Sequence, residues 1–129
     1  MKISELATIT EVSAKTIRYY EQVGLLSAPI RAENGYRHYQ QQDIEVLLFI
    51  RRCRELNIAI DDIKRLVDVQ RNPKDSCKIV DNIIAEQLAR IQQTQRELAI
   101  LEQSLATLAT SCKTHQIEDC GILHTLKSS

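Results

Sequence analysis

Three cysteines are the residues of this 129-residue chain whose type and spacing favour a specific chemistry. Cys77 stands apart, whereas Cys112 and Cys120 are joined by a spacer of seven residues, 113–119, which is long enough to loop back. Thiolates are soft ligands that prefer zinc, cadmium, mercury or lead over magnesium or calcium. Three of them together carry a charge of −3 against the +2 of such an ion. The set therefore predicts a site for a soft divalent metal ion.

A thiol-based redox sensor is the alternative use of the same cysteines. Such sensors rely on a thiol whose pKa is lowered by clustered cations or by a Cys-X-X-Cys pair. The sequence has no such pair, and only Lys78 and Lys113 directly flank the three cysteines. The metal site is the preferred interpretation, and the redox sensor stays open. The fourth cysteine, Cys53, is expected to be a small buried apolar residue in a helix.

A long helix must position these cysteines, because apolar residues recur at heptad spacing between them. Two interleaved sets, spaced by three and four residues, keep one side of a helix facing a partner helix. The second set is interrupted by Gln87 and Thr94. The apolar members, which we call the seam, are Val80, Ile84, Ile91, Leu98, Leu101, Leu105 and Leu108. The seam predicts a homodimer.

The orientation of the dimer follows from the length of that helix. On one helix, Cys77 and Cys112 would be about 52 Å apart at ~1.5 Å per residue, so they cannot bind the same ion. In an antiparallel pair, Cys77 of one chain lies beside Cys112 of the other, and Cys120 can loop back to both. Three thiols then converge at each end of the seam.

The N-terminal part carries the signs of nucleic-acid binding. The net charge is zero, with 17 basic and 17 acidic residues, but residues 1–54 hold eight Lys/Arg against six Asp/Glu. Six of those eight basic residues are arginines. Arginine is suited to bidentate contacts with phosphate and guanine. We therefore expect this part to contact nucleic acid.

Two short helices joined by a tight turn are predicted at the start of the chain. Ser4 is expected to cap the first helix, Ser13 caps the second, and Gly24 ends it in a left-handed conformation. This pattern is typical of a helix-turn-helix, whose second helix enters the major groove, although a plain helical hairpin has the same spacing. The candidate DNA contacts on that second helix are Lys15, Thr16, Arg18 and Tyr19.

A hairpin and two more helices are predicted next. Asn34-Gly35 is a strong two-residue turn signal, and its neighbours Tyr36 and Arg37 suit a basic wing on the DNA backbone. A surface hairpin with ordinary charges is the alternative. Asp43 is expected to cap a third helix and Asp61 a fourth.

These residues carry a resemblance to a known family. The string Thr16-Ile-Arg-Tyr-Tyr-Glu-Gln-Val-Gly-Leu-Leu26, then Gly35-Tyr-Arg-His-Tyr39, then a dimerising helix, resemble the MerR family of bacterial transcription regulators. The resemblance covers essentially the whole chain. Cys77, Cys112 and the terminal Asp119-Cys-Gly-Ile-Leu123 are similar to the cadmium/lead-responsive branch. Members of the monovalent-copper branch carry serine at the position of Cys77.

The resemblance implies a mainly α protein. A winged helix-turn-helix domain (1–70) is followed by a linker and dimerisation helix forming an antiparallel coiled coil (71–111), and by a metal-binding loop and tail (112–129). It implies that Arg18 and Tyr19 contact DNA, with Lys15 a weaker candidate, and that the wing grips the backbone through Tyr36 and Arg37. The implied metal ligands are Cys77, Cys112 and Cys120.

The resemblance also implies a function. A homodimer would bind double-stranded promoter DNA, and Cd²⁺ or Pb²⁺, with Zn²⁺ and Hg²⁺ as alternatives, would close the loop. The distorted DNA would then be presented to RNA polymerase, activating metal-resistance or efflux genes. Zinc seeks a fourth ligand, which His115, Glu118, Asp119 or His124 could supply.

Other classes of protein fit the sequence less well. The sequence shows neither a nucleophile–base arrangement nor a phosphate-binding loop, so it does not indicate an enzyme. The first residues include Lys2 and Glu5 and lack the apolar stretch of a secretory signal, and nothing approaches the length of a membrane span. We therefore expect a cytoplasmic protein, where a reducing environment favours metal binding over disulfides.

Overall fold

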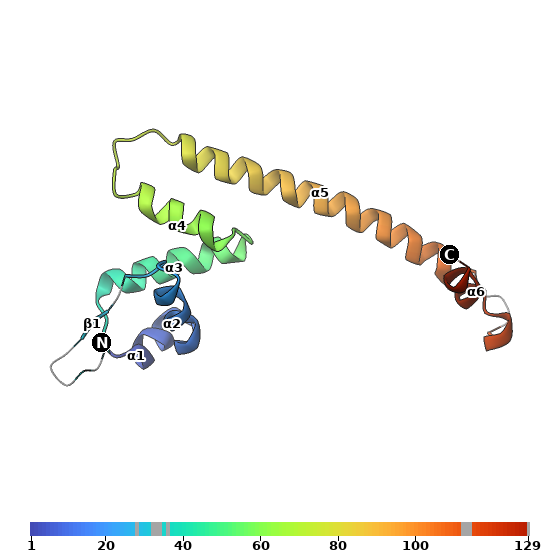
Figure 1. Cartoon of the computed structure of the whole chain (residues 1–129), viewed down its shortest axis with the longest axis horizontal. Helices are drawn as coiled ribbons and strands as arrows, with labels where there is room; N and C mark the ends of the chain where they lie inside the picture. The colour runs from blue at the N-terminus through green and yellow to red at the C-terminus, as the bar shows by residue number, and fades with distance from the viewer. Residues whose placement is uncertain (28, 32–34, 36, 112–114, 129) are drawn as a thin grey trace. The chain divides into compact units, whose positions relative to one another are not determined.

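The structure is a computed structural model that describes residues 1–27, 29–31, 35, 37–111 and 115–128. The chain forms two compact units, Met1–Ile83 and Ile84–Ser129. Helices dominate both, which confirms the mainly α class (Figure 1). Within the described ranges, none of the helices combines the length and apolar character needed to cross a membrane. The predicted division into 1–70, 71–111 and 112–129 stays a prediction.

The helix-turn-helix is formed by α1 (Ile3–Thr10) and α2 (Ala14–Gln22). Ser13 caps α2 as predicted, because its hydroxyl accepts a hydrogen bond from the Thr16 N–H at 3.1 Å. Gly24, with a φ of 79°, adopts the left-handed conformation expected after the helix. The expected cap at Ser4 is wrong, because α1 already begins at Ile3 and its N-cap, Lys2, makes no side-chain bond.

The wing is a two-stranded antiparallel sheet of β1 (Ile30–Arg31) and β2 (Arg37–His38). Ile30 pairs with His38 and Arg31 with Arg37. Between them, Gly35 has a φ of 81°, the positive value that the predicted turn requires. Asn34 and Tyr36 lie outside the described residues, and only the backbone of Arg37 is described.

The next two helices are α3 (Gln41–Glu55) and α4 (Ile60–Val69). Neither predicted aspartate is an N-cap. Asp43 is the third residue of α3, and its carboxylate accepts the N–H of the true N-cap, Gln40, at 2.8 Å. Asp61 is the second residue of α4, which follows Ala59. Carboxylates are favourable throughout the first turn because of the helix dipole, so an acidic residue locates that turn only approximately.

The core of the first unit lies between α1, α2, α3 and α4. Its fully buried side chains come from every one of these helices, and Tyr39 joins them from the end of the wing. Cys53 is buried in this core, as predicted. The members with no exposed surface are Leu6, Ile17, Leu47, Ile50 and Ile63.

The long helix α5 (Lys78–Ala109) has 32 residues, which corresponds to about 48 Å. Its first turns belong to the first unit, where Ile83 is buried and Val80 packs against the core. Beyond Ile83 the helix continues into the second unit. A single turn of 3-10 helix (Ile117–Asp119) and the short helix α6 (Gly121–Lys127) complete that unit.

Candidate functional site

The second helix of the helix-turn-helix, α2, presents its candidate side chains to solvent. Lys15 and Arg18 are exposed, and Tyr19 keeps half of its surface exposed. The ring of Tyr19 lies 6.0 Å from that of Tyr20, which is buried on the opposite side with Ile17. The inward residues thus fix the helix on the core. The outward ones form a face that can reach a DNA groove.

Thr16 is half-buried and takes part in the cap of the same helix. The hydroxyl of Ser13 donates to the Thr16 hydroxyl oxygen at 2.8 Å. Because this oxygen acts as an acceptor in the cap, its own hydrogen stays available to a further acceptor, such as a phosphate oxygen. The predicted role of Thr16 is therefore compatible with its place in the fold.

Arg51 positions the turn of the helix-turn-helix, a role that no sequence pattern indicated. From α3, its guanidinium donates to the carbonyl oxygen of Thr10 at 3.2 Å. It also forms ion pairs with Glu11 at 3.0 Å and with Glu55 at 3.6 Å. Glu11 is the left-handed residue that ends α1. Arg51 therefore ties the end of α1, and the turn into α2, to the side of α3.

The cysteines have different environments. Cys77 is exposed and directly precedes α5, whereas Cys120 is partly buried at the start of α6. Cys112 lies outside the described residues. Burial raises the pKa of the Cys53 thiol, so this group stays protonated at neutral pH and is a poor ligand. The described residues alone bring together no group of three His, Cys, Asp or Glu side chains around a metal position.

A close approach of the backbone brings the neighbours of two cysteines together. A side chain built on Gly121 would place its Cβ 2.3 Å from the carbonyl oxygen of Ser111. Only glycine permits such an approach to a backbone atom. Ser111 directly precedes Cys112 in the sequence, and Gly121 directly follows Cys120. The loop 112–120 is therefore closed at its base by backbone packing.

The other candidate ligands lie around this loop. His115 is exposed and has a φ of 60°, a conformation that few non-glycine residues adopt. A ring nitrogen of His124 lies 3.1 Å from the carbonyl oxygen of Glu118, which holds α6 against the 3-10 turn. Glu118 and Asp119 are exposed. The segment 115–124 therefore carries oxygen and nitrogen donors close in sequence to Cys120.

The seam of α5 is exposed along most of its length in the single chain. The exposed fraction rises from 37% at Ile91 to 66% at Leu105. Near the C-terminal end, a shallow apolar groove is lined mainly by Leu98, Leu101, Leu105 and Ala109. Contiguous apolar surface of this kind marks a site of protein association rather than a solvated face.

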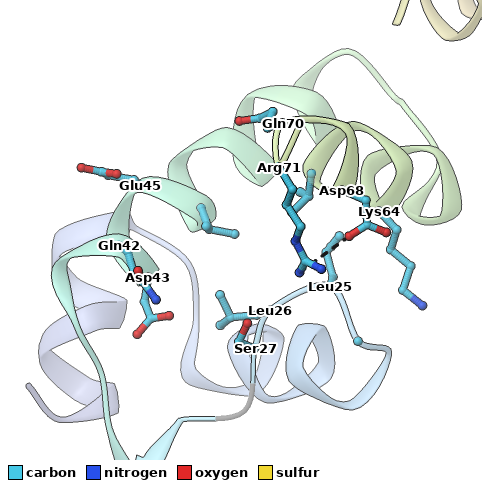
Figure 2. Close-up of a pocket in the computed structure, with 13 residues that line it drawn as sticks. Leu25, Leu26, Ser27, Gln42, Asp43, Glu45, Lys64, Asp68, Gln70 and Arg71 are labelled. Atoms are coloured by element: carbon cyan, nitrogen blue, oxygen red, sulfur yellow. Dashed lines mark ion pairs between the residues drawn. The ribbon is translucent and has the colours of Figure 1, made fainter. Parts of the chain in front are cut away.

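The first unit also contains a cavity of about 590 Å³ between the loop after α2, the start of α3 and α4. Figure 2 shows Arg71 directed at Asp68, with which it forms an ion pair at 3.8 Å. Asp43 and Lys64 also line the cavity. Because acidic and basic side chains surround it together, the cavity favours neither an anion nor a cation.

Two family models match the chain. Residues 1–70 match the model described as MerR HTH family regulatory protein. Residues 44–108 match the model described as MerR, DNA binding. Together they extend from the first helix to the last turn of α5.

Individual relatives match over nearly the full length. The chain is 36% identical over 127 residues to the HTH-type transcriptional regulator CueR of Vibrio cholerae, which covers 98% of this chain and 91% of that protein. It is 36% identical over 126 residues to a probable heavy metal-dependent transcriptional regulator of Haemophilus influenzae, covering 98% of both. The crystal structure of the transcription regulator PbrR691 from Ralstonia metallidurans CH34, in complex with lead(II), matches with a TM-score of 0.89 and 35% identity, over 98% of both chains.

Proposed function

This chain belongs to the MerR family of regulatory proteins, and we propose that it is a heavy-metal-dependent transcriptional regulator that senses soft divalent ions. It binds promoter DNA as a homodimer and activates metal-resistance or efflux genes when it binds Cd²⁺ or Pb²⁺. As a member of a family of regulators, it is not an enzyme, as the sequence predicted.

The observation that carries the proposal is the contact between Ser111 and Gly121. It holds the sequence neighbours of Cys112 and Cys120 within van der Waals distance of each other. A loop whose two ends are held together in this way suits two thiolates that bind one ion, since the fold already meets the free energy of bringing those ends together. We infer that this pair forms the core of the metal site.

The third ligand of the proposed site is Cys77 of the partner subunit. Cys77 is exposed at one end of the seam, and residue 112 lies beyond the other end. In an antiparallel dimer formed along the seam, the two ends meet at both sides of the assembly. Two sites then form per dimer, each with thiols from both chains.

The number of thiolates selects the ion. Two thiolates around a monovalent ion leave a net charge of −1, and a third thiolate restores that same net charge when the soft ion is divalent. We therefore propose Cd²⁺ or Pb²⁺, with Zn²⁺ and Hg²⁺ as alternatives. For Zn²⁺ we propose His115 as the fourth, tetrahedral ligand, because its exposed ring lies in the same loop.

The proposed DNA contacts come from two elements. Lys15, Thr16, Arg18 and Tyr19 of α2 enter the major groove, and the wing contacts phosphates through Tyr36 and Arg37. We call the helix-turn-helix and wing of one chain a head. An antiparallel dimer presents two heads to the half-sites of a pseudo-palindromic promoter. The support is the exposed outer face of α2, fixed on the core by Ile17 and Tyr20.

The proposed switch acts between two geometries of the dimer. A metal ion that binds one geometry better shifts the population towards it, and its affinity difference sets the size of the shift. The new angle between the heads bends or untwists the promoter, at an energy that depends on the DNA sequence. We propose that RNA polymerase in the cytoplasm then uses the realigned promoter.

A metal titration of the reduced full-length protein tests this function. Cd²⁺, Pb²⁺, Zn²⁺, Hg²⁺ and Cu⁺ are added separately while thiolate-to-metal absorption is recorded. We expect saturation at one divalent ion per chain, with Cd²⁺ or Pb²⁺ bound most tightly. Tight binding of Cu⁺ alone would contradict the divalent assignment. No saturable binding of any ion would leave a DNA-binding dimer that responds to thiol oxidation instead.

Substituting Gly121 by alanine is expected to weaken metal binding. The added Cβ must push the Ser111 carbonyl from 2.3 Å to an ordinary contact distance, which opens the base of the loop. Displacement of a supporting contact around a metal site costs affinity by about 10- to 100-fold. Ser111→Ala is the matched control, because it removes the hydroxyl and keeps the carbonyl. If both variants bind metal as the wild type does, the loop is not held by this contact.

A further inference from the structure

Tyr39 connects the base of the wing to the recognition helix. It directly follows β2, and its side chain is only 1% exposed. The phenol hydroxyl donates a hydrogen bond to a carboxylate oxygen of Glu21, in the last turn of α2. A hydroxyl bonded to an ionised carboxylate belongs to the stronger class of hydrogen bonds, because the acceptor carries a full charge.

The backbone around Tyr39 is held as firmly as its side chain. The Tyr39 N–H donates to the carbonyl oxygen of Met1 at 2.8 Å, which fixes the wing to the start of α1. The next residue, Gln40, donates its N–H to Asp43 at 2.8 Å at the start of α3. Because both sides of Tyr39 are anchored, its hydroxyl is held in place for Glu21.

Glu21 is itself well placed on the recognition helix. It lies three residues after Arg18, so the two side chains are neighbours on the helix surface. It also follows Tyr20, which anchors α2 in the core. The bond to Tyr39 therefore acts on the same part of α2 that presents its DNA-facing side chains, and it links that part to the wing.

Packing alone does not account for the hydroxyl. A phenylalanine would fill the same space and bury the same apolar ring. Buried tyrosine hydroxyls need a partner, but that partner can be any nearby backbone carbonyl. Here it is a charged side chain of the element that reads DNA. Replacing Tyr39 with phenylalanine therefore separates the effect of the hydrogen bond from the effect of burying the ring.

We propose that Tyr39 and Glu21 are positioning residues that lock the wing to the recognition helix, so that groove and phosphate contacts engage DNA as one rigid head. This inference rests on the proposed function. A head whose parts are fixed in advance loses less conformational freedom on binding than one whose wing must be ordered on the DNA. The bond therefore supports affinity although neither side chain need contact DNA.

The test uses Tyr39→Phe in the full-length protein, with a duplex that the wild type selects from a random-sequence pool. Affinity is measured by fluorescence anisotropy over a series of salt concentrations. We expect about tenfold weaker binding, because the wing must then be ordered on the DNA. We also expect the salt slope to fall by about 0.9 for each phosphate contact that the wing loses. A lower folded fraction alone would leave this slope unchanged.

Glu21 provides the second arm of the test. Glu21→Gln keeps an acceptor for the hydroxyl and is expected to retain part of the affinity, whereas Glu21→Ala should lose at least as much affinity as Tyr39→Phe. Because the two residues share this bond, the double variant should be no weaker than Glu21→Ala alone. Additive losses, or an unchanged slope in Tyr39→Phe, would overturn the inference. If the wild type selects no duplex, the proposed function fails instead.

Discussion

Replacing Cys77 with serine is expected to abolish saturable binding of Cd²⁺ and Pb²⁺ by the full-length dimer. Cys77 is exposed and lies outside the core, so the substitution leaves the fold intact. A serine hydroxyl stays protonated at neutral pH and is a hard donor, so one of the three soft ligands is lost. Thiolate-to-metal absorption during titration measures the loss, and affinity for promoter DNA is expected to change by less than about twofold, within the ordinary effect of a surface substitution.

The Cys77→Ser variant also distinguishes a three-thiolate site for a divalent ion from a two-thiolate site for a monovalent ion. With Cys112 and Cys120 left, the site has two thiolates, and we expect it to keep a monovalent soft ion such as Cu⁺. Cys53→Ala is the matched control. Its thiol is buried and its pKa is raised by burial, so removing it should lower the thermal stability and leave metal stoichiometry unchanged. Retained Cd²⁺ binding in Cys77→Ser would remove Cys77 from the site.

Local signals in the sequence predicted the helix-turn-helix well. The cap at Ser13 and the left-handed residue at Gly24 depend on the backbone within a few residues, so the residue types alone indicate them. The acidic residues were less informative, because a carboxylate is favourable at several positions of a first turn. Asp43 and Asp61 therefore indicated the presence of helices, and their exact first residues had to come from the structure.

Contacts between distant residues were beyond the reach of these signals. Arg51 bonds the turn at Thr10 and Glu11, and Tyr39 bonds Glu21, but no periodicity links these positions in the sequence. Opposite charges and tyrosines are too common to be paired without coordinates. Gly121 was also missed as a packing residue, because a glycine in a terminal loop has no pattern that reveals which backbone atom approaches it.

The heptad pattern predicted an apolar face on α5. It did not indicate which part of that face packs on the same chain and which part packs on a partner subunit. Val80 belongs to the seam, yet it packs on the core of its own chain, beside the buried Ile83, which is not a seam residue. From Ile84 to Leu105 the seam is exposed, and Leu108 is half-buried. Apolar residues at regular spacing indicate only that one side of a helix avoids water. The division between intrachain and interchain packing came from burial in the folded chain.

Substituting Leu98 by glutamate is expected to convert the dimer into monomers. Leu98 is 58% exposed in the single chain and lies near the middle of α5. In an antiparallel pair that aligns residues 77 and 112, it packs beside Ile91 of the partner subunit, so each dimer would bury two carboxylates in apolar surroundings. The effective cost of burying an unpaired charge is several kcal/mol, which weakens association by about a thousandfold or more.

Ile100→Glu is the matched control for this substitution. Ile100 is 68% exposed on the same helix, but two residues further on it points to nearly the opposite side. Sedimentation equilibrium should show a dimer for Ile100→Glu and a monomer for Leu98→Glu at the same concentration. The reverse result would show that the dimer uses another face of α5.

The Leu98→Glu monomer also tests whether promoter binding and metal binding both depend on the dimer. In the proposed dimer, promoter binding needs the helix-turn-helix domains of both chains, and each metal site needs Cys77 from one chain with Cys112 and Cys120 from the other. Leu98→Glu should therefore lose promoter binding and divalent-metal binding together, although it changes no residue of either site. If the monomer still bound one Cd²⁺ with three thiolates, the ligands would have to come from a single chain. The cross-chain site would then be wrong, since it rests on the ends of a 32-residue helix being too far apart for one chain to bring all three thiols to one ion.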